Sequence, residues 1–323
     1  MQISSLGINW RKSNAHLLLL SKFLHPNSID EFAKADYWNN VLGENAEQAI
    51  KRFFDEGMFL QADLEGQLDY KFKATELKNM LKERGLKVSG RKDELITRLI
   101  QADPENMKKS VKGTTIVLCS EEGRAIAEQY LSDKLAKRTR LNEIVGEYLR
   151  QRNFKEASLA VASFEAQQVF PRGVGISWEN HNPTSNINAL NAIFSFKPKI
   201  LSQLENNLLE MLRFSAGMDY LWGTNNAQWL PPDFETGLAI DKVAAARMFI
   251  ANAYFHSSIT QYRTSGVVNQ VQILSKNCCE TCMKLSGNKF ALNAVPELPY
   301  EHCTREAGCN CTVIPMVRGV EYG

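Results

Sequence analysis

The sequence predicts a mainly α-helical protein of several domains with a smaller β component, an α+β chain. Of its 323 residues, 44% are hydrophobic and 23% are charged, which is typical of globular chains long enough for two or three cores. Apolar residues recur at helical spacing over much of the chain, whereas six of the seven cysteines crowd into residues 278–311. The last segment therefore requires a different kind of stabilisation from the rest.

Residues 1–71 form the first predicted region, and we expect them to be helical. Asn45 is a candidate N-cap, with Gln48 three positions later, and Gly57 can end the helix that follows. The apolar positions of this helix, Ala49, Ile50, Phe53 and Phe54, are expected to share one face. An extended piece is expected over 58–64, a strand over 114–119 and a helix over about 121–131.

The order of these pieces leaves two interpretations open. Residues 1–71, completed by 106–132, resemble the parts of a winged helix whose halves are separated by an inserted hairpin. The alternative is an unrelated helical scaffold that carries the same insertion.

The inserted segment, residues 72–105, predicts two short helices that share one small apolar contact. Thr75 can cap the first helix, and Gly85 can adopt the left-handed conformation that ends it. The second helix is expected to start after Ser89 and Gly90. The predicted inward positions are Leu77, Met80 and Leu81 in the first helix, and Leu95, Ile96, Leu99 and Ile100 in the second.

This segment resembles the SAP family of DNA-binding modules. The matching residues are Glu76, Leu77, Lys78, Leu81, Gly85, Leu86, Ser89, Gly90, Lys92, Glu94, Leu95, Arg98 and Leu99. The resemblance covers the whole motif, about a tenth of the chain, and implies binding to double-stranded DNA with a preference for A·T-rich duplex. A charged helical pair that docks on another protein is the alternative.

The local charge independently favours DNA. Residues 72–102 contain eight Lys and Arg against four Asp and Glu, a local net charge of +4 that exceeds the +2 of the entire chain. The turn before the second helix offers backbone N–H groups at a helix N-terminus beside two cations, which suits a phosphate. The candidate DNA-binding residues are Lys78, Lys82, Arg84, Lys87, Ser89, Gly90, Arg91, Lys92 and Arg98.

Two further helical regions are expected over 106–170 and 171–270, with a loop at 171–175 and helices at about 190–217 and 240–263. The N-terminal sequence lacks the features of a signal peptide, and no apolar run approaches the roughly 20 residues that span a bilayer. We therefore expect a cytoplasmic protein without a membrane partner.

Residues 271–323 are predicted to be a small zinc-binding domain. Cys279 and Cys282 form a C-x-x-C pair, and Cys303, Cys309 and Cys311 follow about twenty residues later, so four of these five thiolates can complete a tetrahedral Zn²⁺ site. Neighbouring Cys278 and His302 are additional candidates. A disulfide cluster and a redox C-x-x-C pair are the alternatives, and a reducing compartment argues against the first.

The same C-terminal segment resembles the phage Mu-type minor head proteins. The matching positions are Cys279, Cys282, Gly287, Phe290, Pro296, Pro299, Cys309 and Cys311. Cys303 and the insertion 304–308 depart from that pattern. The resemblance implies a compact cysteine-bound domain of phage or prophage ancestry.

The functional interpretation is a DNA-binding protein, and no catalytic residue is assigned. A Walker loop, a nucleophile elbow and an HExxH helix are absent from the sequence. His181 and His256 are the residues on which a nuclease could be built, although a single histidine is more often structural. A SAP-targeted nuclease and a structural phage head morphogenesis protein are therefore the alternatives.

Overall fold

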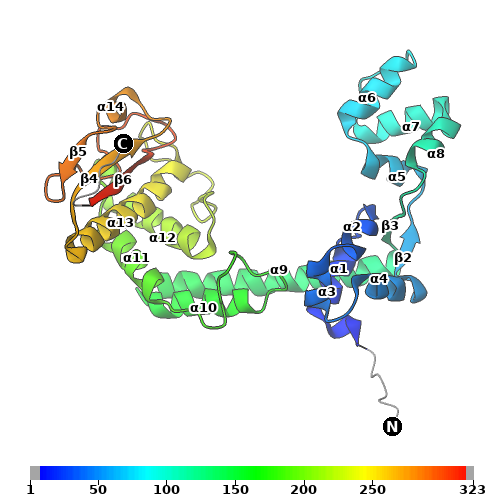
Figure 1. Ribbon diagram of the computed structural model, residues 1–323, viewed down its shortest axis with the longest axis horizontal. Helices are drawn as coiled ribbons and strands as arrows, with labels where there is room; N and C mark the ends of the chain where they lie inside the picture. The colour runs from blue at the N-terminus through cyan, green and yellow to red at the C-terminus, as the bar shows by residue number, and fades with distance from the viewer. Residues whose placement is uncertain (1–7, 318–323) are drawn as a thin grey trace, which may run out of the picture. The chain divides into compact units, whose positions relative to one another are not determined.

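The computed structural model describes residues 8–317, which divide into two compact units at residues 138/139. The prediction of a mainly helical chain with small sheets is confirmed (Figure 1). The long helix α9 contributes its first part to the first unit and its last part to the second.

The first unit contains a small antiparallel sheet and a set of short helices. Its elements are η1 (Trp10–Lys12), α1 (Asn14–Ser21), β1 (Asn27–Ser28), α2 (Asp30–Ala33), α3 (Asp36–Leu42), α4 (Ala46–Asp55), β2 (Phe59–Gln61), α5 (Leu64–Lys71), α6 (Ala74–Glu83), α7 (Lys92–Ala102), α8 (Pro104–Val111), β3 (Ile116–Cys119) and the start of α9 (Glu121–Arg150). The strand order is β1-β3-β2, with Leu60 opposite Leu118. The sheet therefore closes across an insertion that holds α5 to α8.

Helix α4 begins where the sequence predicts. The Asn45 side chain caps it by accepting hydrogen bonds from the backbone N–H groups of Glu47 (2.8 Å) and Gln48 (3.3 Å), and Gly57 follows its end with φ +73°. Ala49, Ile50 and Phe53 are buried, but the expectation that Phe54 shares this face is wrong. Phe54 is exposed, and its ring packs edge-on against the Phe59 ring.

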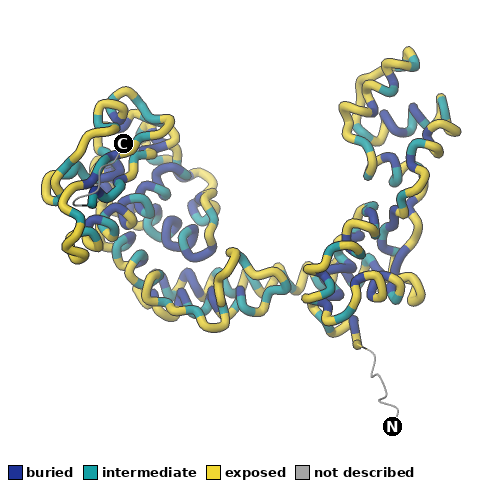
Figure 2. Tube along the Cα trace, viewed as in Figure 1, coloured by how far each residue is buried: buried dark blue, intermediate teal, exposed yellow. Residues whose placement is uncertain are grey.

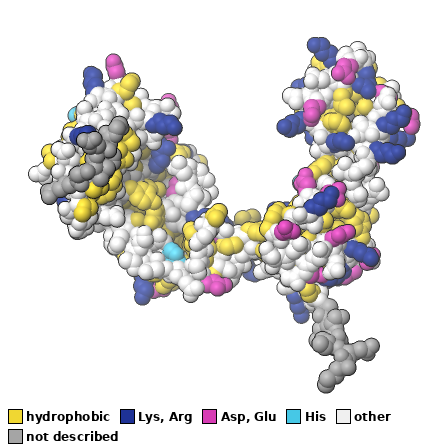
Figure 3. Space-filling view, in the orientation of Figure 1, with side chains coloured by type: hydrophobic (Ala, Val, Ile, Leu, Met, Phe, Trp, Pro, Cys, Tyr) yellow, Lys and Arg dark blue, Asp and Glu magenta, His cyan; other side chains and the backbone are white. Residues whose placement is uncertain are grey.

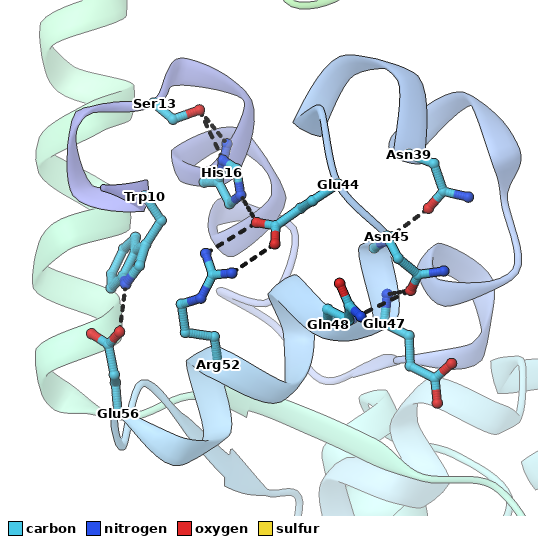
Figure 4. Close-up of polar contacts among 11 residues, drawn as sticks. Trp10, Ser13, His16, Asn39, Glu44, Asn45, Glu47, Gln48, Arg52 and Glu56 are labelled. Atoms are coloured by element: carbon cyan, nitrogen blue, oxygen red, sulfur yellow. Dashed lines mark hydrogen bonds and ion pairs between the residues drawn. The ribbon is translucent and has the colours of Figure 1, made fainter. Parts of the chain in front are cut away.

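A buried ion network ties α1 to α4 in the first unit (Figure 4). Glu44 Oε1 lies 2.6 Å from Nε2 of the fully buried His16, and both Glu44 carboxylate oxygens accept hydrogen bonds from Arg52, at 3.0 and 2.6 Å. Burial raises the pKa of the Glu44 carboxyl, but the hydrogen bonds from Arg52 and His16 outweigh burial and lower the pKa below its ordinary value.

We expect Glu44→Gln to destabilise the first unit by about 2 kcal/mol at pH 7, because it removes the charge that Arg52 binds. A lowered folded-state pKa gives stability that is complete above the ordinary value of 4.5 and is lost as the pH falls through the lowered value. Urea unfolding followed by circular dichroism at pH 7 and pH 3 should therefore show a smaller acid effect in the variant. An equal acid effect in both proteins would contradict this assignment.

The second unit combines a helical layer with a second antiparallel sheet of order β5-β4-β6. Its elements after α9 are α10 (Phe154–Ala166), α11 (Thr184–Ser195), η2 (Lys199–Leu201), α12 (Asn206–Trp222), α13 (Lys242–Ser265), β4 (Val268–Ser275), α14 (Glu280–Met283), β5 (Lys289–Ala291) and β6 (Cys311–Val317). The helices bury a continuous apolar cluster, visible as the dark blue interior in Figure 2, and three of the cysteines belong to it.

Two of the helix predictions for this region are wrong. The single helix expected over about 190–217 is broken into α11, η2 and α12 because Pro198 lacks a backbone N–H and excludes the helical conformation just before it. Conversely, α9 continues well past residue 131 because residues 131–145 contain no glycine or proline, and Gly146 packs against the Phe214 ring.

Candidate nucleic-acid interface and metal centre

The segment predicted to bind DNA lies in a four-helix module formed by α5 to α8. The module has its own apolar core, to which all four helices contribute: Leu68, Leu77, Leu81, Leu95, Ile96, Leu99, Met107 and Val111. Met80 and Ile100, which were expected to be buried, are half-buried at the edge of this core. The central hairpin α6–α7 agrees with the prediction, whereas the flanking helices α5 and α8, which complete its core, were not predicted.

The turn between α6 and α7 depends on two glycines. Gly85 ends α6 in the predicted left-handed conformation (φ +67°). Gly90 has φ +129°, and a Cβ atom there would lie 2.3 Å from the carboxylate of Glu94. That carboxylate accepts a hydrogen bond from the Arg91 backbone N–H at 3.1 Å, so this amide is already partnered at the start of α7.

The N-terminal cap of α6 differs from the prediction. Thr75 lies inside the helix, and the residue before the helix is Lys73, whose backbone N–H donates to the Glu76 carboxylate at 2.6 Å. A glutamate in the first turn thus satisfies the amide, which is the same device that α7 uses.

Three of the nine candidate DNA-binding residues hold the hairpin in shape through contacts with other parts of the module. Arg84 donates to Asp103 Oδ2 through Nε (3.0 Å) and Nη2 (2.8 Å), and so links α6 to the end of α7. Lys92 Nζ lies 3.0 Å from Asp69 Oδ1 on α5. Arg98 donates to the backbone carbonyls of Lys87 and Ser89, which fixes the turn.

The remaining cations face solvent. Lys78 and Lys82 lie four residues apart on the exposed face of α6, and Lys87 and Arg91 lie in the turn before α7. Arg91 pairs with Asp93 at 2.9 Å, but its side chain is 81% exposed, so this pair offers little resistance to exchange with a phosphate. In Figure 3, Lys and Arg side chains are distributed over the surface of the part of the molecule formed by α5 to α8.

The comparison with known protein families agrees with this geometry. Residues 71–104 match the SAP domain family. The match runs from the last residue of α5 through α6, the turn and α7 to the first residue of α8, and supports nucleic-acid binding by this module. No curated protein and no solved structure matches the chain, so the resemblance of the C-terminal segment to phage Mu-type head proteins finds no further support.

The second candidate site brings together all five cysteines that the sequence analysis proposed as ligands. Their Sγ atoms form two groups that share Cys282, and within each group all Sγ atoms lie within 4.8 Å of one another. The first group adds Cys279 and Cys303, and the second adds Cys309 and Cys311. All seven cysteines of the chain are free thiols.

The sulfur–sulfur distances distinguish between the earlier interpretations of this cluster. The Sγ atoms of Cys279 and Cys303 are 3.8 Å apart, and those of Cys282 and Cys309 are 4.0 Å apart. A disulfide requires about 2.05 Å. With a Zn–S bond of about 2.3 Å, neighbouring sulfurs of a tetrahedral site lie ~3.8 Å apart. The cluster therefore fits a metal site better than a set of disulfides.

The surroundings of the thiols favour the ionised form at two positions. Burial raises the pKa of Cys279, but hydrogen bonds from the backbone of Thr304 and Cys282 outweigh burial and lower the pKa to about 6. The thiols of Cys303 and Cys311 donate hydrogen bonds to Cys309 and lower its pKa. Thiolates are the form that binds metal ions.

The loops that hold the cysteines are fixed by the sheet and by α13. Ser275, the last residue of β4, places its Oγ 3.0 Å from Cys311 Sγ and donates to the Cys282 carbonyl at 3.2 Å. Gly308 packs so closely on α13 that a Cβ atom there would lie 2.8 Å from Met248 Cε. The cysteine loops are thus part of the core of the second unit.

Other candidate residues lie away from the sulfur cluster. The side chain of His302 is 66% exposed and lies in neither sulfur group among the described residues, and Cys278 is likewise outside both groups. Nε2 of His181 lies 3.3 Å from Ser158 Oγ and 3.1 Å from Asn186 Nδ2. His256 stacks on Phe196 with ring centroids 3.9 Å apart. Both of these histidines have packing partners that account for their positions.

The structure also bears on the membrane prediction. Within residues 8–317 no helix combines the length and the apolar character that crossing a bilayer requires.

Proposed function

We propose that this chain binds duplex DNA through the SAP module, with phosphate contacts from the exposed cations of α6 and of the turn before α7. The observation that supports this proposal most directly is that the segment matching the SAP family also presents Lys78, Lys82, Lys87 and Arg91 to solvent. Contacts of this kind position a protein on the duplex and carry little base readout.

The nine proposed DNA-binding residues divide into two roles. We assign direct phosphate contact to Lys78, Lys82, Lys87 and Arg91. The backbone of Ser89 and Gly90 lies at the same turn and can accompany them. In the other role, Arg84, Lys92 and Arg98 hold the hairpin in shape through their contacts with Asp103, Asp69 and the turn carbonyls.

The parts of the first unit that flank the inserted module are consistent with this assignment. Its order of helices and strands, with the sheet order β1-β3-β2, suits the winged-helix-like arrangement that we propose for residues 1–71 and 106–132. The exposed face of α4, the helix before β2, carries Glu47 and Asp55 as well as Lys51. A mixed face of this kind is poorly suited to phosphates, which leaves the SAP module as the DNA-binding surface.

For the second unit we propose a structural zinc centre. Cys279, Cys282, Cys303 and Cys309 are the proposed ligands because their two short sulfur–sulfur distances match the edges of a tetrahedron. Cys311 hydrogen-bonds to Ser275 and is the alternative ligand. A zinc ion bound there would link the loops around C-x-x-C and C-x-C to each other. A phage or prophage origin rests only on the sequence resemblance of this segment.

The dependence of affinity on salt tests the proposed function. We expect log affinity of the full chain for an A·T-rich duplex to fall linearly with log salt concentration, with a slope of about −3 to −4 for four phosphate contacts. Fluorescence anisotropy between 50 and 300 mM KCl would measure it. A slope near zero, or no binding at 50 mM, would contradict the proposal. Cleavage of plasmid DNA in the presence of Mg²⁺ or Zn²⁺ would instead favour the nuclease alternative.

A further inference from the structure

The second unit contains a cavity of about 420 Å³ at the junction of α9, α11, α12 and the loop after α12. This volume lies within the usual range for small-ligand pockets. Its walls include Arg150, Arg152, Phe194, Glu210, Phe214 and Trp229. The cavity therefore combines aromatic rings with two guanidinium groups.

Both guanidinium groups lie over aromatic rings. The Arg152 guanidinium is 4.0 Å from the centroid of Phe194 and pairs with Glu210 at 2.8 Å. The Arg150 guanidinium is 4.7 Å from the centroid of Phe214, and its ion pair with Glu147 is longer, at 3.5 Å, and exposed. Arg150 is thus the cation more readily available to an anion, because an exposed pair of this length contributes little.

The backbone beside the cavity is unusual in two places. Arg152 has φ +59° and Ala227 has φ +48°, a left-handed region that residues other than glycine rarely adopt. Arg152 follows the end of α9, where glycine is the ordinary choice. An arginine at this position brings a guanidinium group to the cavity but requires a strained backbone conformation. Such outliers concentrate at functional sites.

Ala227 belongs to the loop that delivers Trp229. Its backbone N–H donates at 3.2 Å to Oδ2 of Asp219, a carboxylate that is 2% exposed and also binds Thr224. Two residues later, Trp229 lines the cavity, and its buried Nε1–H has no acceptor among the described residues. The loop fixed by Asp219 thus places the Trp229 ring in the cavity wall.

We propose that this cavity binds one nucleotide. Nucleobases stack on aromatic rings and on arginine planes, which these walls provide. Arg150 then pairs with the phosphate, and the base stacks on an aromatic ring of the wall such as Trp229. A free nucleotide and an unpaired nucleotide of a single strand share this chemistry. The proposal does not depend on the SAP module, and either can fail alone.

The test uses the full chain with Lys78, Lys82 and Lys87 replaced by alanine, so that binding through the SAP module is suppressed. Fluorescence anisotropy with a labelled eight-nucleotide oligo(dT) measures binding, and competition is measured with thymidine monophosphate and with inorganic phosphate. We expect Arg150→Ala to weaken binding about tenfold or more and Trp229→Phe about threefold. Lys155→Ala, which removes one exposed charge outside the cavity, serves as the matched control and should change affinity less than twofold.

Arg152→Gly separates a binding role from a folding role. Because glycine adopts the left-handed conformation without strain, we expect this variant to keep its unfolding temperature while losing affinity. Competition by the mononucleotide would identify a free-nucleotide site, and binding of the strand alone would identify a single-strand site; both support the proposal. It is overturned if nothing binds, if inorganic phosphate competes as well as the nucleotide, or if Arg150→Ala and Lys155→Ala behave alike.

Discussion

A variant in which Lys78, Lys82 and Lys87 are replaced by alanine is expected to bind duplex DNA about 100-fold more weakly than the parent chain. These side chains face solvent, and losing one phosphate contact weakens binding by roughly fivefold, which corresponds to about 1 kcal/mol. The salt slope should become shallower by about three units. Anisotropy titrations at several salt concentrations measure both quantities.

The matched control removes the same charge from the second unit, by Lys155→Ala, Lys197→Ala and Lys284→Ala. These lysines are also exposed, so the control has the same net charge as the variant. If both triple variants lose affinity equally, the effect belongs to overall charge and the assignment to the SAP module is wrong. Arg84→Ala provides a further contrast. Because it removes the hydrogen bonds to Asp103, it should change the free energy of unfolding more than the free energy of DNA binding.

Protein purified without added metal is expected to contain one zinc ion per chain, and Cys282→Ser is expected to lose it. Cys282 is fully buried and belongs to both sulfur groups, so no choice of ligands replaces it well. Because the cysteine loops share the core of the second unit, we expect metal loss to lower the unfolding temperature by about 10 °C. Elemental analysis and calorimetry measure these two effects.

Cys278→Ser is the matched control for this experiment. The Cys278 thiol is next in sequence to the proposed ligand Cys279 but lies outside both sulfur groups among the described residues. Its replacement should leave zinc content and unfolding temperature unchanged. Serine at Cys303 or Cys309 should resemble Cys282→Ser. A parent protein that contains no zinc, or a Cys282→Ser variant as stable as the parent, would return the cluster to a redox or disulfide interpretation.

Several features that a local pattern determines were predicted from the sequence. Asn45 could be recognised as a cap and Gly85 as a helix end because each acts through its own conformation and its near neighbours. The helix break at Pro198 follows an equally local rule, and the prediction overlooked it. The cysteine cluster could be predicted because the spacing of thiols along the chain restricts which of them can meet.

Features that depend on distant partners could not be predicted. Local charge and the SAP resemblance suggested DNA contacts for Arg84, Lys92 and Arg98. Their partners, however, lie on other elements or on the turn backbone, and only the folded chain brings them together. The cavity was missed for the same reason. Arg152 and Trp229 are far apart in sequence, and neither belongs to a motif that marks a binding site.

The SAP module is inserted between β2 and β3, so its folding is coupled to that of the sheet in the first unit. The backbone N–H of Ala62 donates to the Ile116 carbonyl at 2.9 Å, so the strands on either side of the insertion are paired up to its edges. A folded insertion with neighbouring ends closes this gap without further entropy loss, whereas an unfolded one becomes a loop of about 50 residues that costs about 2 kcal/mol more than a tight turn. The stability of the β1-β3-β2 sheet therefore depends on whether the module is folded. Any ligand that stabilises α5 to α8 also stabilises the β2–β3 pair, with no contact between ligand and sheet.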